Sequence, residues 1–214
     1  MKTTVLLHAD EIARVLDRLA CQIMERHGDC EQTVLLGIQR RGVDLAVRLG
    51  KVLEDKLGRK LPFGTLDINL YRDDWTTMHA RPTIGEANIT TLDNKNVILV
   101  DDVLFTGRTI RAALEAILDY GRPKTVELLV LVDRGHRELP IHGDYVGRKI
   151  NTARSEKVNV LMEERDGRDE VVLESADLNA YGEFDSIAAL QDCHNPYDSF
   201  ALHKAALIAC GVIP

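Results

Sequence analysis

The feature that most constrains the fold is the stretch VILVDDVLFTGRT at residues 97–109. Four apolar residues, typical of a buried strand, lead into Asp101 and Asp102 and then into a turn that opens a helical pattern. Neighbouring carboxylates repel each other, and an ionised carboxylate is costly to remove from water. We therefore expect a strand–turn–helix unit whose two aspartates serve a ligand outside the strand.

Helical and extended patterns alternate over most of the chain. Helical spacing of apolar residues is found in residues 8–28, 43–58 and 108–121. Strand patterns are found in residues 32–38, 64–74, 96–100 and 124–135. Asp10 is a candidate N-cap, Gly58 and Gly121 are expected to end helices, and residues 75–94, which show no period, predict a long mobile loop. The alternation predicts an α/β fold with a mainly parallel sheet flanked by helices.

Ligands of such sheets bind at the carboxyl ends of the strands. Three turns that carry charge or glycine follow predicted strands: GIQRRG at 37–42, DDVLFTG at 101–107 and VDRGHR at 132–137. The binding site is expected where these turns meet.

The composition is that of an ordinary globular chain, with 214 residues and a net charge of −7. Residues 163–214 hold 11 acidic and three basic residues, so the preceding part is close to neutral and an anionic partner is not excluded. No apolar run is long enough to span a bilayer, and acidic residues come too early for a signal peptide. The four cysteines lack zinc-site spacing. We expect a cytoplasmic protein without a membrane partner.

The turn after the two aspartates is suited to an anion. Thr106, Gly107, Arg108 and Thr109 stand where a strand becomes a helix, and the first amides of a helix lack intrahelical partners. Such a turn can hold a phosphate, while the carboxylates can accept hydrogen bonds from a diol. Together they predict a site for a ribose 5-phosphate that reacts at C1. An ordinary phosphate-binding turn or an acidic pair that binds Mg²⁺ is the alternative, and no GxxxxGK[ST] motif is present.

The same stretch resembles the phosphoribosyl pyrophosphate (PRPP) motif of type I phosphoribosyltransferases. The flanking text, including GIQRRGVDLAVRL, LDINLYRDD and LVDRGHRELPI, resembles the PyrR family of pyrimidine operon regulators over about residues 5 to 174. The resemblance implies a type I phosphoribosyltransferase fold with a small hood, and a homo-oligomer. It also implies that uracil and PRPP are converted to UMP and diphosphate with Mg²⁺, and that leader RNA is bound in response to UMP. A different base, such as hypoxanthine or orotate, or an RNA-binding regulator with vestigial catalysis, stays open.

The resemblance also implies roles for individual residues. Asp101 and Asp102 would hold the ribose hydroxyls and stabilise positive charge at C1, and Asp102 is the better candidate for taking the N1 proton of uracil. The residues that would bind PRPP are Arg40, Arg41, Gly42, Arg72, Asp101, Asp102, Thr106, Gly107, Arg108 and Thr109. A non-proline cis peptide is expected between Arg40 and Arg41.

The base and the metal are assigned in the same way. Val132, Asp133 and Arg134 would read the uracil edge, and Asp133 would bind Mg²⁺ directly or through water. Residues 71–82 match a loop that closes over PRPP, where Arg72 and Arg81 are candidate contacts.

RNA contact is implied for Arg18, Arg26, His136, Arg137 and Arg148. The alternative is that several of these arginines serve the active site or a subunit contact. Asp17, Cys21 and His142 depart from the family pattern, which leaves open whether RNA regulation is retained. Residues 1–174 are expected to form the phosphoribosyltransferase domain. Residues 175–214, with one predicted helix at 199–210, form a C-terminal extension of unknown role.

Overall fold

The computed structural model describes residues 2–68, 91–175 and Lys204. The described residues up to Ser175 belong to one compact unit. Arg72, Arg81, most of the loop predicted at 75–94 and the helix predicted at 199–210 lie outside the described residues. Those predictions therefore stay predictions, as does the role of the C-terminal extension.

A five-stranded parallel sheet forms the centre of this unit, in the order β3-β2-β4-β5-β6. The strands are β2 (Thr33–Ile38), β3 (Phe63–Leu66), β4 (Asn96–Leu104), β5 (Thr125–Asp133) and β6 (Tyr145–Lys149). Strands covered on both faces read as continuous apolar runs, and every residue of β2 is buried. The predicted α/β class with a mainly parallel sheet is confirmed.

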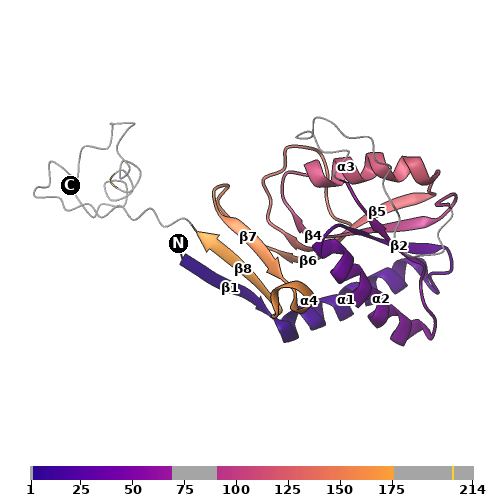
Figure 1. Ribbon diagram of the computed structural model, residues 1–214, viewed down its shortest axis with the longest axis horizontal. Helices are drawn as coiled ribbons and strands as arrows, with labels where there is room; N and C mark the ends of the chain where they lie inside the picture. The colour runs from indigo at the N-terminus through magenta and orange to yellow at the C-terminus, as the bar shows by residue number, and fades with distance from the viewer. Residues whose placement is uncertain (1, 69–90, 176–203, 205–214) are drawn as a thin grey trace, which may run out of the picture. The chain divides into compact units, whose positions relative to one another are not determined.

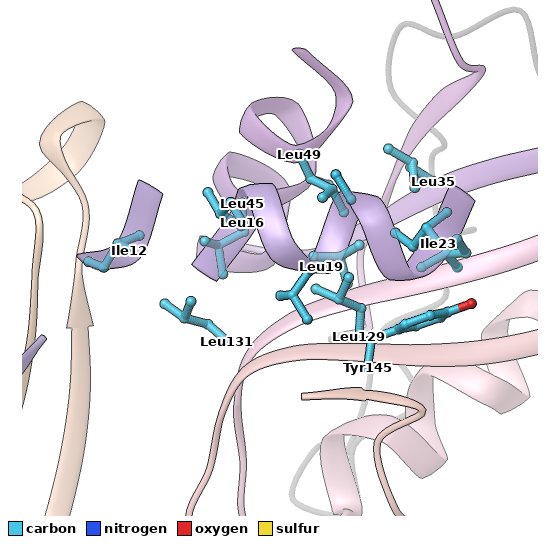
Figure 2. Close-up of a cluster of buried hydrophobic side chains, with 14 of the residues drawn as sticks. Ile12, Leu16, Leu19, Ile23, Leu35, Leu45, Leu49, Leu129, Leu131 and Tyr145 are labelled. Carbon is cyan, nitrogen blue, oxygen red and sulfur yellow. The ribbon is translucent and has the colours of Figure 1, made fainter. Parts of the chain in front are cut away.

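Helices cover both faces of the sheet (Figure 1). The helices α1 (Ala9–His27) and α2 (Arg41–Leu57) pack on one face, and α3 (Arg108–Ile117), followed by the 3₁₀ turn Leu118–Tyr120, packs on the other. Successive strand residues point to opposite faces, so Leu35 joins the cluster under α1 and α2 while Leu36 joins the cluster under α3. Figure 2 shows the first cluster, in which side chains of α1 reach toward those of β5 and β6.

A second, antiparallel sheet of three strands forms a small hood, in the order β1-β8-β7. Its strands are β1 (Lys2–His8), β7 (Lys157–Leu161) and β8 (Glu170–Ser175), and the single-turn helix α4 (Glu163–Asp166) lies between β7 and β8 in the chain. Met162 and Val171 join the cluster under α1 and α2, so the hood shares the apolar core of the main unit.

The helix ends differ from the sequence prediction at two places. The first helix is capped at His8 and not at Asp10, because the backbone N–H of His8 donates to the Glu11 carboxylate at 3.0 Å. Asp10 instead lies in the first turn and pairs with Arg14 at 2.8 Å. In the helix predicted at 108–121, the α-helical part ends at Ile117 and a 3₁₀ turn follows.

The strand ends differ as well. The strand predicted at 96–100 continues to Leu104, so both aspartates belong to β4 rather than to the turn after it. In the described part of the strand predicted at 64–74, residues up to Leu66 pair in β3 and residues 67 and 68 are not in a strand, while residues 69–74 lie outside the described residues. Among the described residues, no helix combines the length and the apolar character needed to cross a membrane.

Candidate active site

The carboxyl ends of β2, β4 and β5 lie next to one another, because these strands are neighbours in a parallel sheet. The turns that follow them are also joined directly. The backbone N–H of Arg134, after β5, donates to the carbonyl of Leu104 at the end of β4 at 3.1 Å. The three turns named from the sequence therefore meet at one edge of the sheet.

Asp101 and Asp102 stand at this edge on successive positions of β4. The Asp101 side chain is buried, with 6% of the residue exposed, and it accepts the Asp102 backbone N–H at 3.0 Å. Asp102 accepts the backbone N–H of Val103 at 3.0 Å. Burial raises the pKa of both carboxyls, and the charge of Asp102 raises the pKa of Asp101 further. The strand holds two carboxylates at a free-energy cost, as expected of groups that act on a ligand.

The turn after β2 runs against the backbone of β4. A Cβ at Gly42 would stand 2.4 Å from the carbonyl oxygen of Val100, and a Cβ at Gly37 would stand 2.8 Å from the carbonyl oxygen of Gly42. Two backbone segments can approach each other this closely only where the residue at the contact has no side chain. The glycines thus bring the beginning of α2 beside Asp101.

The two arginines of this turn have different surroundings. Arg40 is exposed, whereas Arg41 pairs with Asp166 of α4 at 3.2 Å, and its charge offsets part of the rise that burial causes in the pKa of Asp102. The Nε of Arg41 is buried and has no hydrogen-bond partner among the described residues. A buried guanidinium N–H without a partner is costly, so Arg41 keeps an unsatisfied donor near this edge.

The predicted position of the cis peptide is wrong by one residue, since the bond is Gln39–Arg40. The carbonyl of Arg40 accepts the backbone N–H of Val43 at 3.2 Å. The Arg40–Arg41 peptide therefore already belongs to the first turn of α2.

The turn after β4 has the backbone that an anion site requires. Gly107 is the N-cap of α3 at φ +92°, and its carbonyl accepts the backbone N–H of Arg111 at 2.9 Å. The Oγ of Thr106 accepts the backbone N–H of Arg108 at 3.4 Å. Thr109 lies in the first turn, which contains no acidic residue. The positive end of the α3 dipole is therefore not neutralised from within the helix.

The segment after β5 is tied to its surroundings. Val132 is fully buried, and the carboxylate of Asp133 accepts the backbone N–H of Gly135 at 3.0 Å. The guanidinium of Arg134 lies 4.1 Å from the centroid of the Phe105 ring, and its Nη2 donates to the carbonyl of Ala153 at 3.0 Å. Burial lowers the pKa of Arg134. The side chain of Arg134 thus stabilises the loop through contacts within the protein. The main-chain groups of this segment are therefore the better candidates for contacting a ligand.

The five residues assigned to RNA fall into two groups. Arg18 and Arg26 lie on α1 and Arg148 on β6, and Arg18 donates to the carbonyl of Gly147 at 2.5 Å. His136 and Arg137 lie instead in the loop after β5. The structure brings the first three to one face of the unit and places the other two at the candidate active site.

Sequence reasoning missed two contacts of the site. Asp166, which pairs with Arg41, follows the strand β7 that was not recognised, and Phe105 was not singled out although Arg134 stacks on it. The acidic run MEERD at residues 162–166 was the available signal for a partner of a basic loop.

Comparison with known proteins places this geometry in a family. Residues 3–165 match the phosphoribosyl transferase domain family. A protein of Syntrophobacter fumaroxidans called bifunctional protein PyrR is 51% identical over 173 residues, which cover 80% of this chain and 93% of that protein. The protein of the same name from Deinococcus radiodurans is 50% identical over 173 residues, which cover 80% of this chain and 94% of its own.

Solved structures agree on the fold. A hypoxanthine phosphoribosyltransferase of Trypanosoma cruzi superposes with a TM-score of 0.61 at 18% identity, over 79% of this chain and 90% of that one. The corresponding enzyme of Staphylococcus aureus has a TM-score of 0.57 at 22% identity, with the same coverage of both chains. At such identities the likeness concerns the fold alone, whereas the close relatives and the matched domain decide the family. The resemblance noted in the sequence is confirmed, and the chain belongs to the PyrR family of phosphoribosyltransferases.

Proposed function

We propose that the chain transfers the phosphoribosyl group of PRPP to uracil and releases UMP and diphosphate. The observation that carries this function is the meeting of three features at one sheet edge. These are the paired carboxylates of β4, the glycine-bounded N-terminus of α3 and the arginine-bearing turn before α2. They offer sites for a ribose, a monophosphate and a diphosphate, which are the three parts of PRPP.

The chemistry needs no covalent enzyme intermediate. The N1–C1 bond forms as the bond between C1 and the diphosphate oxygen breaks, and the electron pair of that bond leaves with diphosphate. Asp101 and Asp102 accept hydrogen bonds from the ribose hydroxyls and stabilise the positive charge that develops on the ring. Asp102, which is less buried than Asp101, is the better placed of the two to take the N1 proton.

The amides at the start of α3 and the hydroxyls of Thr106 and Thr109 would bind the 5-phosphate, and Arg108 lies beside them. Arg41 would meet the leaving diphosphate with its partly exposed guanidinium, and Arg40 with its exposed side chain. Gly42 allows this turn to lie against β4. Main-chain groups of Val132, Asp133 and Arg134 would read the uracil edge.

Magnesium fits this site as an ion that arrives with PRPP. Among the described residues, no cluster of three or more His, Cys, Asp or Glu side chains could hold a metal ion. Mg²⁺ commonly keeps several waters and binds through one or two carboxylates plus substrate phosphates. Asp133 is the proposed protein contact, directly or through water, and Mg²⁺ would neutralise the departing diphosphate.

We propose a second function, UMP-responsive binding of leader RNA, on the face that carries Arg18, Arg26 and Arg148. The acidic residue Asp17 on this helix is paired with Lys56 at 2.8 Å, which offsets its charge near an RNA phosphate. Titration with a pyrimidine-operon leader hairpin at several salt concentrations, with and without UMP, tests this function. A cytoplasmic location and a homo-oligomeric state remain predictions from the sequence.

The base is tested by comparing kcat/KM for uracil, hypoxanthine and orotate at saturating PRPP and Mg²⁺. The proposal expects uracil to exceed the others by about 100-fold or more, because a site built to hydrogen-bond one base edge leaves groups unpaired with another. Preference for either alternative base would overturn the uracil assignment. No turnover with any base, together with UMP-strengthened RNA binding, would favour a regulator with vestigial catalysis.

A further inference from the structure

The guanidinium of Arg137 is engaged by polar groups of the protein itself, which leaves it little capacity to bind an RNA phosphate. Its Nε donates to the carbonyl of Ile141 at 3.0 Å. Its Nη1 lies within hydrogen-bond distance of the carbonyls of Leu104, Phe105 and Gly135, at 3.2, 2.7 and 2.9 Å. Its Nη2 lies 2.5 Å from a carboxylate oxygen of Asp133. All three guanidinium nitrogens are therefore engaged inside the protein, and 22% of the side chain is exposed.

These partners belong to two functional segments. Leu104 ends β4 and Phe105 begins the phosphate-binding turn, whereas Asp133 ends β5 and Gly135 directly follows the residues proposed to read the base. The two segments are also tied by the backbone N–H of Glu138, which donates to the carbonyl of Thr106 at 3.0 Å. The guanidinium is thus one side-chain link between the two halves of the site, in addition to the stacking of Arg134 on Phe105 and the ion pair of Arg108 with Glu138 at 2.7 Å.

The phosphate-binding turn and the base-binding segment are each held in place by secondary structure that does not involve Arg137. The phosphate-binding turn is continuous with β4 and α3, and Asp133 remains in β5. What the guanidinium adds is a fixed spacing between them, because its planar fork holds several acceptors in one rigid arrangement. The distance between a bound 5-phosphate and a bound base depends on that spacing.

We propose that Arg137 is a positioning residue, which couples the phosphate-binding turn to the base-binding segment and is not free to act as an RNA contact. The inference rests on the proposed function, since it takes the segment after β5 to bind the base. It separates Arg137 from Arg18 and Arg148, which belong to the other group of the residues assigned to RNA. Lysine at position 137 keeps the charge that an RNA phosphate would require and loses the fork that positioning requires.

Two ligands of different reach test whether Arg137 positions the two segments relative to each other. UMP reaches from the phosphate-binding turn to the base-binding segment, whereas ribose 5-phosphate occupies the turn and the ribose site only. Calorimetric titration of wild type, Arg137→Lys and the control Arg14→Lys with each ligand is the experiment. Arg14 is a suitable control because it is an exposed arginine of α1 that pairs with Asp10 at 2.8 Å.

For Arg137→Lys, the inference expects UMP affinity to fall about tenfold or more while ribose 5-phosphate affinity changes less than about threefold, since misplacing one half of a site weakens only ligands that bridge both. The uracil KM should rise and kcat should fall, and leader RNA should bind with unchanged salt dependence. The control should match wild type in every titration. If Arg137→Lys does not fold, Arg137→Gln, whose amide can still reach carbonyl acceptors, replaces it with the same expectation.

Wild-type affinity for both ligands in the folded variant would overturn the inference and leave the proposed function standing. An equal loss for both ligands would also overturn it, because that pattern indicates general damage to the phosphate site. Wild-type protein that binds neither UMP nor ribose 5-phosphate would overturn the proposed function and the inference together.

Discussion

Gly42 lies against Val100 so closely that a Cβ on the glycine would stand 2.4 Å from the carbonyl oxygen of the valine. This contact sets the beginning of α2 against β4 immediately before the paired aspartates. The atom in the way is the backbone oxygen of Val100, a fully buried residue of β4, so it cannot move aside as a side chain would.

Gly42→Ala should therefore destabilise the protein by about 1–3 kcal/mol, as overpacking in a core does, and it should lower kcat/KM for PRPP. Thermal unfolding and steady-state kinetics measure both effects. Gly50→Ala is a matched control in the same helix, because its Cβ would meet only the Leu35 side chain at 3.7 Å. The control should be neutral or stabilising, since alanine is a better helix former than glycine. Equal stability of the two variants would contradict the close-approach argument.

The double variant Asp101→Asn, Asp102→Asn should abolish turnover and leave the fold intact. Asparagine keeps the size of each side chain and removes the charges that ribose binding and the charge at C1 require. Turnover at the wild-type rate in this variant would contradict the assignment of the two carboxylates. Circular dichroism and the melting temperature verify that the variant is folded.

The same pair predicts a pH dependence of stability. The pKa of both carboxyls is raised in the folded state above the ordinary value of 3.8, so the folded state binds more protons than the unfolded state. Their contribution to stability is thus most favourable at low pH and is lost as the pH rises from about 4 through the raised pKa values. The stability gained by the asparagine double variant over wild type should grow between pH 4 and pH 7. Denaturant titrations at several pH values test this, and a difference that is constant with pH would refute it.

Arg48 links α2 to the hood through hydrogen bonds to Glu164 and Asp169 at 2.6 to 2.8 Å. These bonds are the main reason that the pKa of each carboxyl lies below its ordinary value. A depressed pKa contributes stability that is present above the unfolded pKa and lost as the pH falls through the folded one.

Arg48→Gln should cost about 1–3 kcal/mol at pH 7, which is the range for hydrogen bonds to charged groups. The cost should shrink as the pH falls below the ordinary carboxyl pKa. Arg14→Gln, which breaks an exposed and solvent-screened pair of α1, should change stability much less than Arg48→Gln. An equal effect of the two substitutions would show that the Arg48 network does not fasten the hood.

Arg18→Gln and Arg148→Gln should each weaken binding of the leader hairpin and reduce the slope of log affinity against log salt by about one, since each removes one phosphate contact. Both arginines also donate to backbone carbonyls, of Gly147 and Leu6, so melting curves must accompany the titrations. Unchanged salt slopes in folded variants would remove these residues from the RNA face.

The parts of the site that could be predicted from the sequence are those encoded within one short segment. The pattern from Val97 to Thr109 contains the strand, the turn and the helix start in order, and the structure keeps that order. The parallel sheet followed from the alternation of such segments. The position of the β4 end could not be predicted, because Asp101 and Leu104 are held in the strand by pairing with Val130 and Asp133 of β5.

The hood and the contacts of Arg137 depend on residues far apart in the chain. β1 pairs with β8, which joins Lys2 to Ser175, and no local pattern encodes that partnership. In the same way, the signal for Arg137 was a basic residue in a basic loop, which suits RNA equally well. Only its contacts with Leu104, Phe105 and Asp133 distinguish a positioning role from a nucleic-acid contact.

The central claim is tested most directly by a steady-state assay of the purified protein with uracil, PRPP and Mg²⁺, in which UMP formation is followed by chromatography. The account predicts sustained UMP formation that stops when EDTA removes the metal and that the Asp101→Asn, Asp102→Asn variant lacks. Absence of UMP under these conditions, from a folded protein that still binds PRPP, would contradict it.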